Sequence, residues 1–120
     1  MSEPAPHQIV RSVALALPEA VERDHHGRPS FRVGGKIFAT LWGPDHVNVM
    51  LDESGILTAI QRHPEACSGF RWGRRLAAVQ IDLRRASAPL VEELLADAWE
   101  GKAPKRLLAM RSAHGGHPTG

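Results

Sequence analysis

Two glycines, Gly34 and Gly35, lie between two runs of strand-forming residues and constrain the fold more than any other feature. The flanking runs predict strands over residues 30–33 and 36–42. The glycines supply the positive φ angles that a two-residue hairpin turn requires. The sequence therefore predicts a β-hairpin here, and it indicates an architecture more clearly than an activity.

The segments around this hairpin predict a helix and a third strand. Apolar residues at helical spacing predict a helix over residues 7–17, which Pro18 ends. The polar residues 19–29 are expected to form a loop. Residues 46–51 alternate between apolar and polar side chains, which predicts a strand with one buried face. Together with the hairpin, this strand makes an antiparallel meander.

The second half of the chain predicts helices around further strands. Residues 53–62 are expected to form a short helix. Residues 76–83 alternate as a strand, whereas residues 66–75 fit either a loop or a short strand. A continuous apolar stripe predicts the last main helix over residues 88–100, and one or two helical turns follow over residues 105–110.

These elements predict a single-domain α+β fold with the order α-β-β-β-α-(β)β-α. Helices are expected to pack on one face of a mainly antiparallel sheet. The domain is expected to span residues 1–111, and the small, polar residues 112–120 are expected to form a disordered tail. A chain of 120 residues suits one such domain.

Composition limits the environment and the partners of the chain. The formal net charge is only +2, although the isoelectric point is about 9.2, and this balance permits nucleic-acid binding without arguing for it. The one cysteine, Cys67, can form no internal disulfide, so we expect a reducing cytoplasm. The first residues lack the apolar region of a signal peptide. No apolar run approaches the ~20 residues of a membrane span, so we expect no membrane contact.

Basic residues gather in two parts of the sequence. Residues 62–85 contain six arginines against two acidic residues, and residues 102–111 contain four cations and no acid. Guanidinium groups suit phosphate, because their planar fork donates two parallel hydrogen bonds. Phe70 and Trp72 lie among the arginines and could stack on bases, unless they belong to the core and the arginines are merely solvated. The candidate nucleic-acid-binding residues are Arg28, Arg32, Lys36, Arg71, Arg74, Arg75, Lys105 and Arg106.

A second interpretation places the binding surface on the open face of the sheet. Apolar and aromatic side chains on that face would line a surface for a protein or a small ligand, whereas clustered arginine would indicate nucleic acid. The residues of this alternative face are Phe38, Trp42, Met50, Phe70 and Trp72.

Catalytic and metal sites find little support in the sequence. Cys67 lacks a defined base, although His63 lies four residues before it, and nucleophilic catalysis needs a base and an orienting group in contact. The Asp-His-His segment at residues 24–26 has no matching ligand pair elsewhere, and His114 and His117 lie in a glycine-rich tail. We therefore expect no catalytic residue, no metal site and no cofactor.

Three segments resemble, in the same order, segments of the MmcQ/YjbR family. They are Leu15-Ala16-Leu17-Pro18, residues 27–39 with the sequence GRPSFRVGGKIFA, and Ala98-Trp99 followed by Ala103-Pro104-Lys105-Arg106-Leu107. The resemblance covers about residues 8–108. It implies a compact double-wing α/β fold, likened to the frataxin-like and secretion-chaperone-like sheets, and a DNA-binding role. The chain departs from the family's aromatic-Gly-His-Pro turn, because Arg28 stands where relatives commonly carry the histidine.

We therefore expect a non-enzymatic, cytoplasmic protein that binds DNA through an Arg-rich face. The alternative is an interaction module that binds a protein or a small ligand on the open face of its sheet. The position of the arginines relative to the exposed aromatic residues decides between these two functions.

Overall fold

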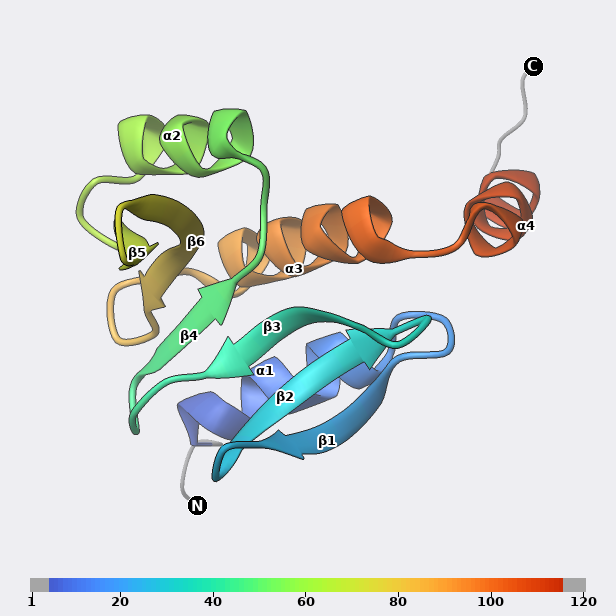
Figure 1. Ribbon diagram of the computed structural model, residues 1–120, viewed down its shortest axis with the longest axis horizontal. Coiled ribbons are helices and arrows are strands. Elements are labelled where there is room, and N and C mark those ends of the chain that lie inside the picture. The colour runs from blue at the N-terminus through green and yellow to red at the C-terminus, as the bar shows by residue number, and fades with distance from the viewer. Residues whose placement is uncertain (1–4, 116–120) are drawn as a thin grey trace.

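The computed structural model describes residues 5–115, and its strands form one sheet with helices packed beside it (Figure 1). In chain order the elements are α1 (Pro6–Leu15), β1 (Val21–His25), β2 (Arg28–Val33), β3 (Lys36–Leu41), β4 (His46–Val49), α2 (Glu53–Arg62), β5 (Cys67–Trp72), β6 (Arg75–Asp82), α3 (Ala88–Lys102) and α4 (Lys105–Gly115). This arrangement confirms the predicted α+β fold in one domain.

All six strands belong to one antiparallel sheet with the order β1-β2-β3-β4-β6-β5. Strands β1 to β4 follow one another as a meander. The chain then forms α2 and enters the far edge of the sheet as β5, and β6 returns between β5 and β4. The segment 66–75, which fits a loop or a short strand in the sequence, is thus largely an edge strand.

The loop expected over residues 19–29 is wrong, because this segment forms β1 and the start of β2. Most residues of β1 are charged, so they show no apolar alternation, and hydrogen bonds to β2 hold the strand at the edge of the sheet. His26 and Gly27 turn the chain with φ angles of 55° and 83°. The Asp24 carboxylate accepts a hydrogen bond from the Gly27 N–H at 3.2 Å.

The hairpin at Gly34 and Gly35 is confirmed. Val33 lies opposite Lys36, and the two glycines have φ angles of 59° and 81°. A Cβ atom on Gly34 would lie 2.9 Å from Cγ of Pro104. The turn is therefore packed against the segment that joins α3 to α4.

Helix α3 supplies the helical side of the core. Its predicted apolar stripe is buried and consists of Leu90, Val91, Leu94, Leu95, Ala98 and Trp99. The Ser87 hydroxyl caps the helix by accepting a hydrogen bond from the Leu90 N–H at 3.2 Å. The Trp99 indole N–H donates to the Pro18 carbonyl at 2.9 Å. This bond fastens α3 to the segment that follows α1.

Helix α4 is longer than the one or two turns expected over residues 105–110, because it continues to Gly115. The expected domain boundary at residue 111 therefore falls inside a helix. Residues 116–120 of the expected tail lie outside the described residues. No helix within residues 5–115 is long and apolar enough to cross a membrane.

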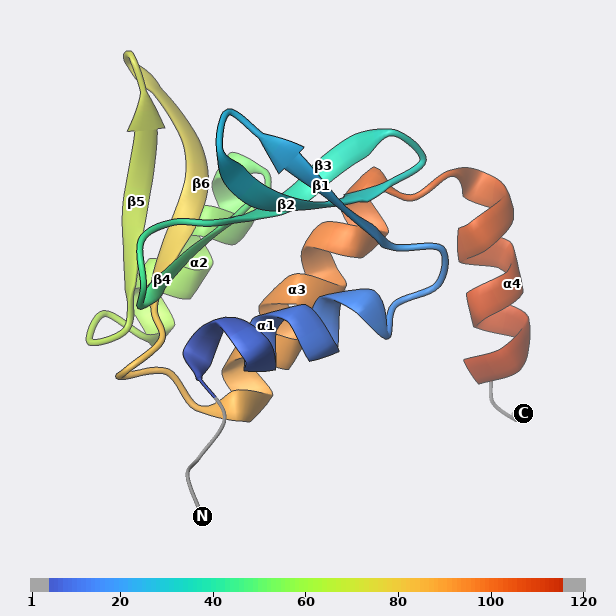
Figure 2. The same cartoon turned by 90° about the horizontal axis from the view of Figure 1, so that it is seen from below.

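The two faces of the sheet differ in what covers them. Helix α3 packs on β3 and β4, α2 packs on β5 and β6, and α1 packs on α3. Figure 2 shows α1 and α3 on one side of the sheet, while the β5–β6 hairpin projects beyond the other strands on the opposite side. We call the covered side the helical face and the other side the open face.

Candidate nucleic-acid interface

The β5–β6 hairpin carries an aromatic side chain that solvent reaches freely. Trp72, next to the turn, is 72% exposed, and Gly73 turns the chain with a φ angle of 64°. Strand alternation places Phe70 and Trp72 on the same side of β5. A Cβ atom on Gly73 would meet nothing within 4 Å, so no other element crowds the turn. The hairpin thus presents an accessible aromatic platform.

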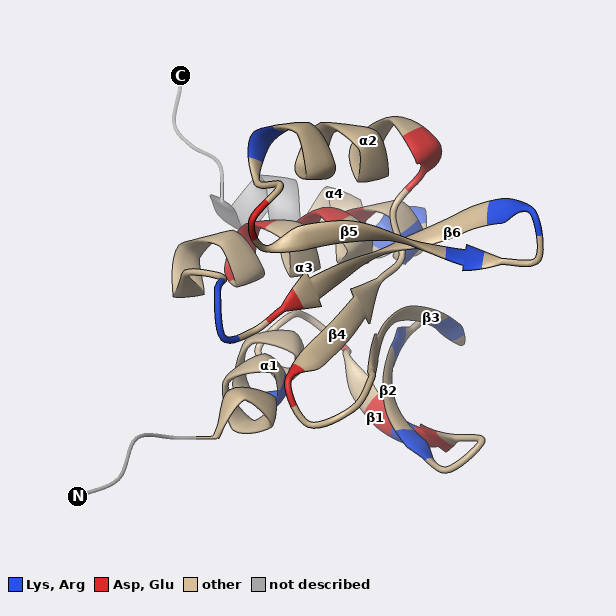
Figure 3. Cartoon of the chain, turned by 90° about the vertical axis from the view of Figure 1, so that its left-hand side faces the viewer, with Lys and Arg blue, Asp and Glu red and all other residues tan. Residues whose placement is uncertain are grey.

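Three arginines surround this platform. Arg71, Arg74 and Arg75 are exposed, and none of them makes an ion pair with another described residue. Nη1 of Arg71 donates a hydrogen bond to the Arg74 carbonyl at 3.1 Å, which holds this guanidinium at the turn. Figure 3 shows basic positions at the hairpin end and on β2, on the side of the molecule away from α1. Without a neighbouring carboxylate, these charges are available to phosphate.

Three other predicted cations lie elsewhere. Lys36 follows the glycine turn that packs on Pro104, and Lys105 and Arg106 belong to α4, at the opposite end of the molecule from β5 (Figure 1). Arg106 donates two hydrogen bonds to Glu19, at 2.9 and 3.0 Å. These bonds lower the pKa of Glu19. The structure therefore does not bring these cations together with the hairpin arginines.

The remaining predicted arginines, Arg28 and Arg32, lie on β2. The Arg28 guanidinium stacks over the Trp42 ring, with Cζ 3.9 Å from the ring centroid, and Trp42 meets Phe70 edge-on at a centroid distance of 4.9 Å. Trp42 follows β3 and Phe70 belongs to β5, so β4 and β6 lie between them. Neighbouring strands are about 4.8 Å apart, so the two rings meet only by reaching across the open face. We call Arg28, Trp42 and Phe70 the aromatic lid.

One polar residue from each strand forms a row across the sheet. Each member is the direct cross-strand partner of the next. From β1 to β5 this polar row consists of Arg23, Ser30, Thr40, Asn48, Gln80 and Ser68. Thr40 is 3% exposed and Asn48 is 1% exposed, although Figure 2 shows no described helix over this face. The large side chains of the open face must therefore cover them.

Hydrogen bonds connect only parts of the polar row. Nε2 of Gln80 donates to Oδ1 of Asn48 at 2.9 Å. The Ser30 hydroxyl donates to the Arg23 carbonyl at 2.9 Å and accepts from Nε of Arg32 at 3.3 Å. The second bond holds the Arg32 guanidinium over the open face.

The alternative ligand or partner face is only partly exposed. Phe38 is fully buried, so it cannot line a surface that a partner reaches. Trp42, Met50 and Phe70 are half-buried, and Trp72 is exposed. Of this set, Trp42 contacts Arg28 and Phe70, so these two aromatic residues lie beside an arginine of the open face.

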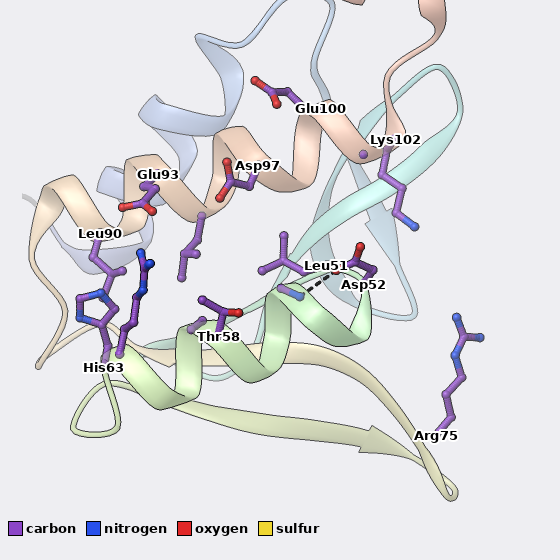
Figure 4. Close-up of a pocket in the computed structure, with 15 residues that line it drawn as sticks. Leu51, Asp52, Thr58, His63, Arg75, Leu90, Glu93, Asp97, Glu100 and Lys102 are labelled. Atoms are coloured by element: carbon purple, nitrogen blue, oxygen red, sulfur yellow. Dashed lines mark hydrogen bonds between the residues drawn. The ribbon is translucent and has the colours of Figure 1, made fainter.

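A depression of about 740 Å³ lies on the helical face between α2 and α3 (Figure 4). Helix α3 lines it with Glu93, Asp97 and Glu100, and Arg75 lines its other end. Burial raises the pKa of Asp97, and the two neighbouring carboxylates raise it further. Arg62 and Lys102 also line the depression, so acidic and basic side chains are mixed there.

The residues considered for catalysis and metal binding lie in different elements, because Cys67 begins β5 and His25 is the cross-strand partner of Arg28. Burial, with a smaller effect of Glu65, raises the pKa of the Cys67 thiol to about 11, so it stays protonated at neutral pH and is a weak nucleophile. The centroids of the His25 and His26 rings lie 4.4 Å apart, and the rings meet edge-on. No group of three or more His, Cys, Asp or Glu in the described part of the chain could hold a metal ion. The side chains of His114 and His117 lie outside the description.

Sequence reasoning missed Arg23 and the polar row. Arg23 lies in the segment expected to be a loop. Alternation does place Thr40, Asn48 and Gln80 on the side of their strands opposite the core, and this signal was available in the sequence. Only the register of the strands shows that the three side chains are neighbours.

Comparisons with known proteins agree with this fold. The family model described as YjbR matches residues 15–101, whereas no curated protein matches the chain. The crystal structure of Deinococcus radiodurans protein DR2400, with the family-model domain DUF419, is similar with a TM-score of 0.64 at 19% sequence identity. The match covers 94% of this chain and 83% of that chain. Because the family model spans most of the chain, in agreement with the three ordered segments, this protein belongs to the YjbR family.

Proposed function

We propose that this protein binds DNA without catalysing a reaction, and that the β5–β6 hairpin is its main contact. The observation that carries the proposal is the exposed Trp72 among Arg71, Arg74 and Arg75, which no described carboxylate neutralises. Guanidinium groups bind phosphate regardless of base sequence, and an exposed indole stacks on bases of any kind. We therefore expect the protein to show little preference for base sequence.

The shape of the hairpin supports this function. A two-stranded β-ribbon fits the major groove of B-DNA. Alternation places Arg71 on the side opposite Trp72, whereas Arg75 is the cross-strand partner of Trp72. Both sides of the ribbon thus carry groups that can reach the groove walls. The carboxylates of α3 lie on the helical face and leave the hairpin end free of acidic residues.

The expected affinity is that of a non-specific binder, about 10⁻⁴–10⁻⁶ M at physiological salt. Each phosphate contact should steepen the plot of log affinity against log salt concentration by roughly 0.9. The test is fluorescence anisotropy with a labelled duplex across a range of salt concentrations. The variant is Arg71→Ala/Arg74→Ala/Arg75→Ala. It should weaken binding by about tenfold or more, to the same extent for duplexes of different base sequence. It should also lower the slope of log affinity against log salt concentration by roughly 2 to 3.

A charge-matched control separates the hairpin from net charge. Arg62→Ala/Lys105→Ala/Arg106→Ala removes an equal number of positive charges from helices α2 and α4 and should weaken binding much less. Equal losses in the two variants would show that net charge alone attracts DNA. If wild-type protein at about 100 μM and low salt binds no DNA, the proposal fails, because even non-specific affinities lie in reach of this concentration.

A further inference from the structure

We propose that the open face binds one unpaired nucleotide, with the base at the aromatic lid and the phosphate at Arg23 and Arg32. The inference rests on the proposed function and makes it more specific, because it names single-stranded segments as the preferred form of DNA. The chemistry required is that of a nucleoside monophosphate unit, which a single strand or a free nucleotide can supply.

Two buried polar groups beneath the lid point to a ligand. Thr40 and Asn48 are direct cross-strand partners and are almost fully buried. Asn48 receives a hydrogen bond at Oδ1, but its amide N–H groups and the Thr40 hydroxyl make no hydrogen bond with any described residue. A buried polar group without a partner is unfavourable. A base edge carries donors and acceptors side by side, so it can satisfy both groups at once.

The lid can give access to these groups because its members belong to β2, to β5 and to the loop after β3, and not to a packed helix. Trp42 is held by a cation–π contact with Arg28 and an edge-on contact with Phe70. Both contacts are weak individually. A base that stacks on the indole takes the place of the Arg28 guanidinium, which then becomes available to the phosphate.

The β1–β2 edge of the open face supplies the charge that a phosphate needs. Arg23, Arg28 and Arg32 make no ion pair with any described residue. Alternation turns the acidic residues of β1 to the helical side, where Glu22 binds Arg11 of α1 at 2.7 Å. The polar row thus leads from an aromatic and amide-lined region over β4 and β6 to a positive edge.

The test compares a labelled single strand with the duplex of the same sequence by fluorescence anisotropy. Thr40→Val removes the unpartnered hydroxyl and keeps the shape, so the variant should fold at least as well as the wild type. It should weaken single-strand binding by about 3- to 10-fold, the effect of one lost hydrogen bond. Trp42→Leu should weaken it by about 5- to 100-fold through lost stacking. Thr58→Val, the same substitution on exposed α2, is the matched control and should change nothing.

The outcomes separate this inference from the proposed function. Tighter binding of the single strand, lost in Thr40→Val and kept in Thr58→Val, supports the inference. Equal binding of both DNA forms with no effect of Thr40→Val overturns it and leaves the hairpin proposal intact. If neither DNA form binds, quenching of tryptophan fluorescence by free AMP is measured next. AMP binding that depends on Thr40 supports a free nucleotide as the ligand, and no AMP binding overturns the inference.

Discussion

The β2–β3 and β5–β6 hairpins are built alike but have different surroundings. Both turn through glycine at positive φ, and both carry cations next to the turn. Gly34 of the first hairpin packs against Pro104, whereas a Cβ atom on Gly73 of the second would meet nothing within 4 Å. Neighbouring elements, and not the turn chemistry, therefore decide that the first turn is packed and the second is open to solvent.

Ion pairs strengthen this contrast. Arg11 of α1 binds Glu22 of β1 with two hydrogen bonds of 2.7 and 3.0 Å, and Arg106 of α4 binds Glu19 just before β1. The start of β1 is thus pinned to two helices, α1 and α4. The arginines of the β5–β6 turn make no such bond with described residues.

The largest expected difference between the hairpins is in stability. Gly34→Val places a β-branched residue at positive φ and against Pro104, so we expect a loss of about 2–5 kcal/mol in the free energy of unfolding. Gly73→Val suffers the backbone strain alone and should cost about 1–3 kcal/mol. Urea denaturation measures both values. Equal losses would show that the contact with Pro104 contributes nothing.

A smaller effect is expected at the ion pair that pins β1. Glu22→Gln should lower the free energy of unfolding by about 0.5–1 kcal/mol at pH 7, because the pair is partly exposed. The Arg11 guanidinium lowers the pKa of Glu22 in the folded state, so the stabilisation is present above the unfolded pKa. The stabilisation is lost as the pH falls through the pKa of Glu22 in the folded state. The free energies of unfolding of wild type and variant should therefore converge in acid. A difference between them that does not depend on pH would argue against the ion pair.

The smallest stability effect is expected at the free hairpin. Trp72→Ala should change the free energy of unfolding by less than about 0.5 kcal/mol, because the side chain is 72% exposed. DNA binding should fall in the same variant, by about 5-fold or more if the indole stacks on a base. Thermal melting and anisotropy of the same preparation test the two expectations together. A much lower melting temperature of the variant would show that Trp72 stabilises the fold and is not reserved for binding.

The sequence predicts the first hairpin better than the second, for physical reasons. Residues 30–42 alternate around a glycine pair, so strands and turn follow directly. In β5, glycine and serine interrupt the pattern, and in β1 the residues are charged. Both are edge strands that depend on hydrogen bonds to an inner neighbour, which composition does not reveal.

The candidate site is predictable in its residue types but not in its grouping. Arg71, Arg74 and Trp72 are close in sequence and remain together in the hairpin. Arg106 is equally basic, but it pairs with Glu19, which depends on where α4 packs. Trp42 meets Phe70 of β5 because both side chains extend over the open face of one sheet, although β4 and β6 lie between their elements. Such contacts depend on the order of the strands in the sheet, which local sequence patterns do not determine.

Amide chemical shifts measured by NMR during titration with DNA would show which hairpin contacts the DNA. We expect the largest shifts in residues 69–76 and at the Trp72 indole N–H, and no change in residues 34–37 and helix α4. Largest shifts at residues 34–37 and 104–108, with none at the β5–β6 turn, would contradict binding through the β5–β6 hairpin.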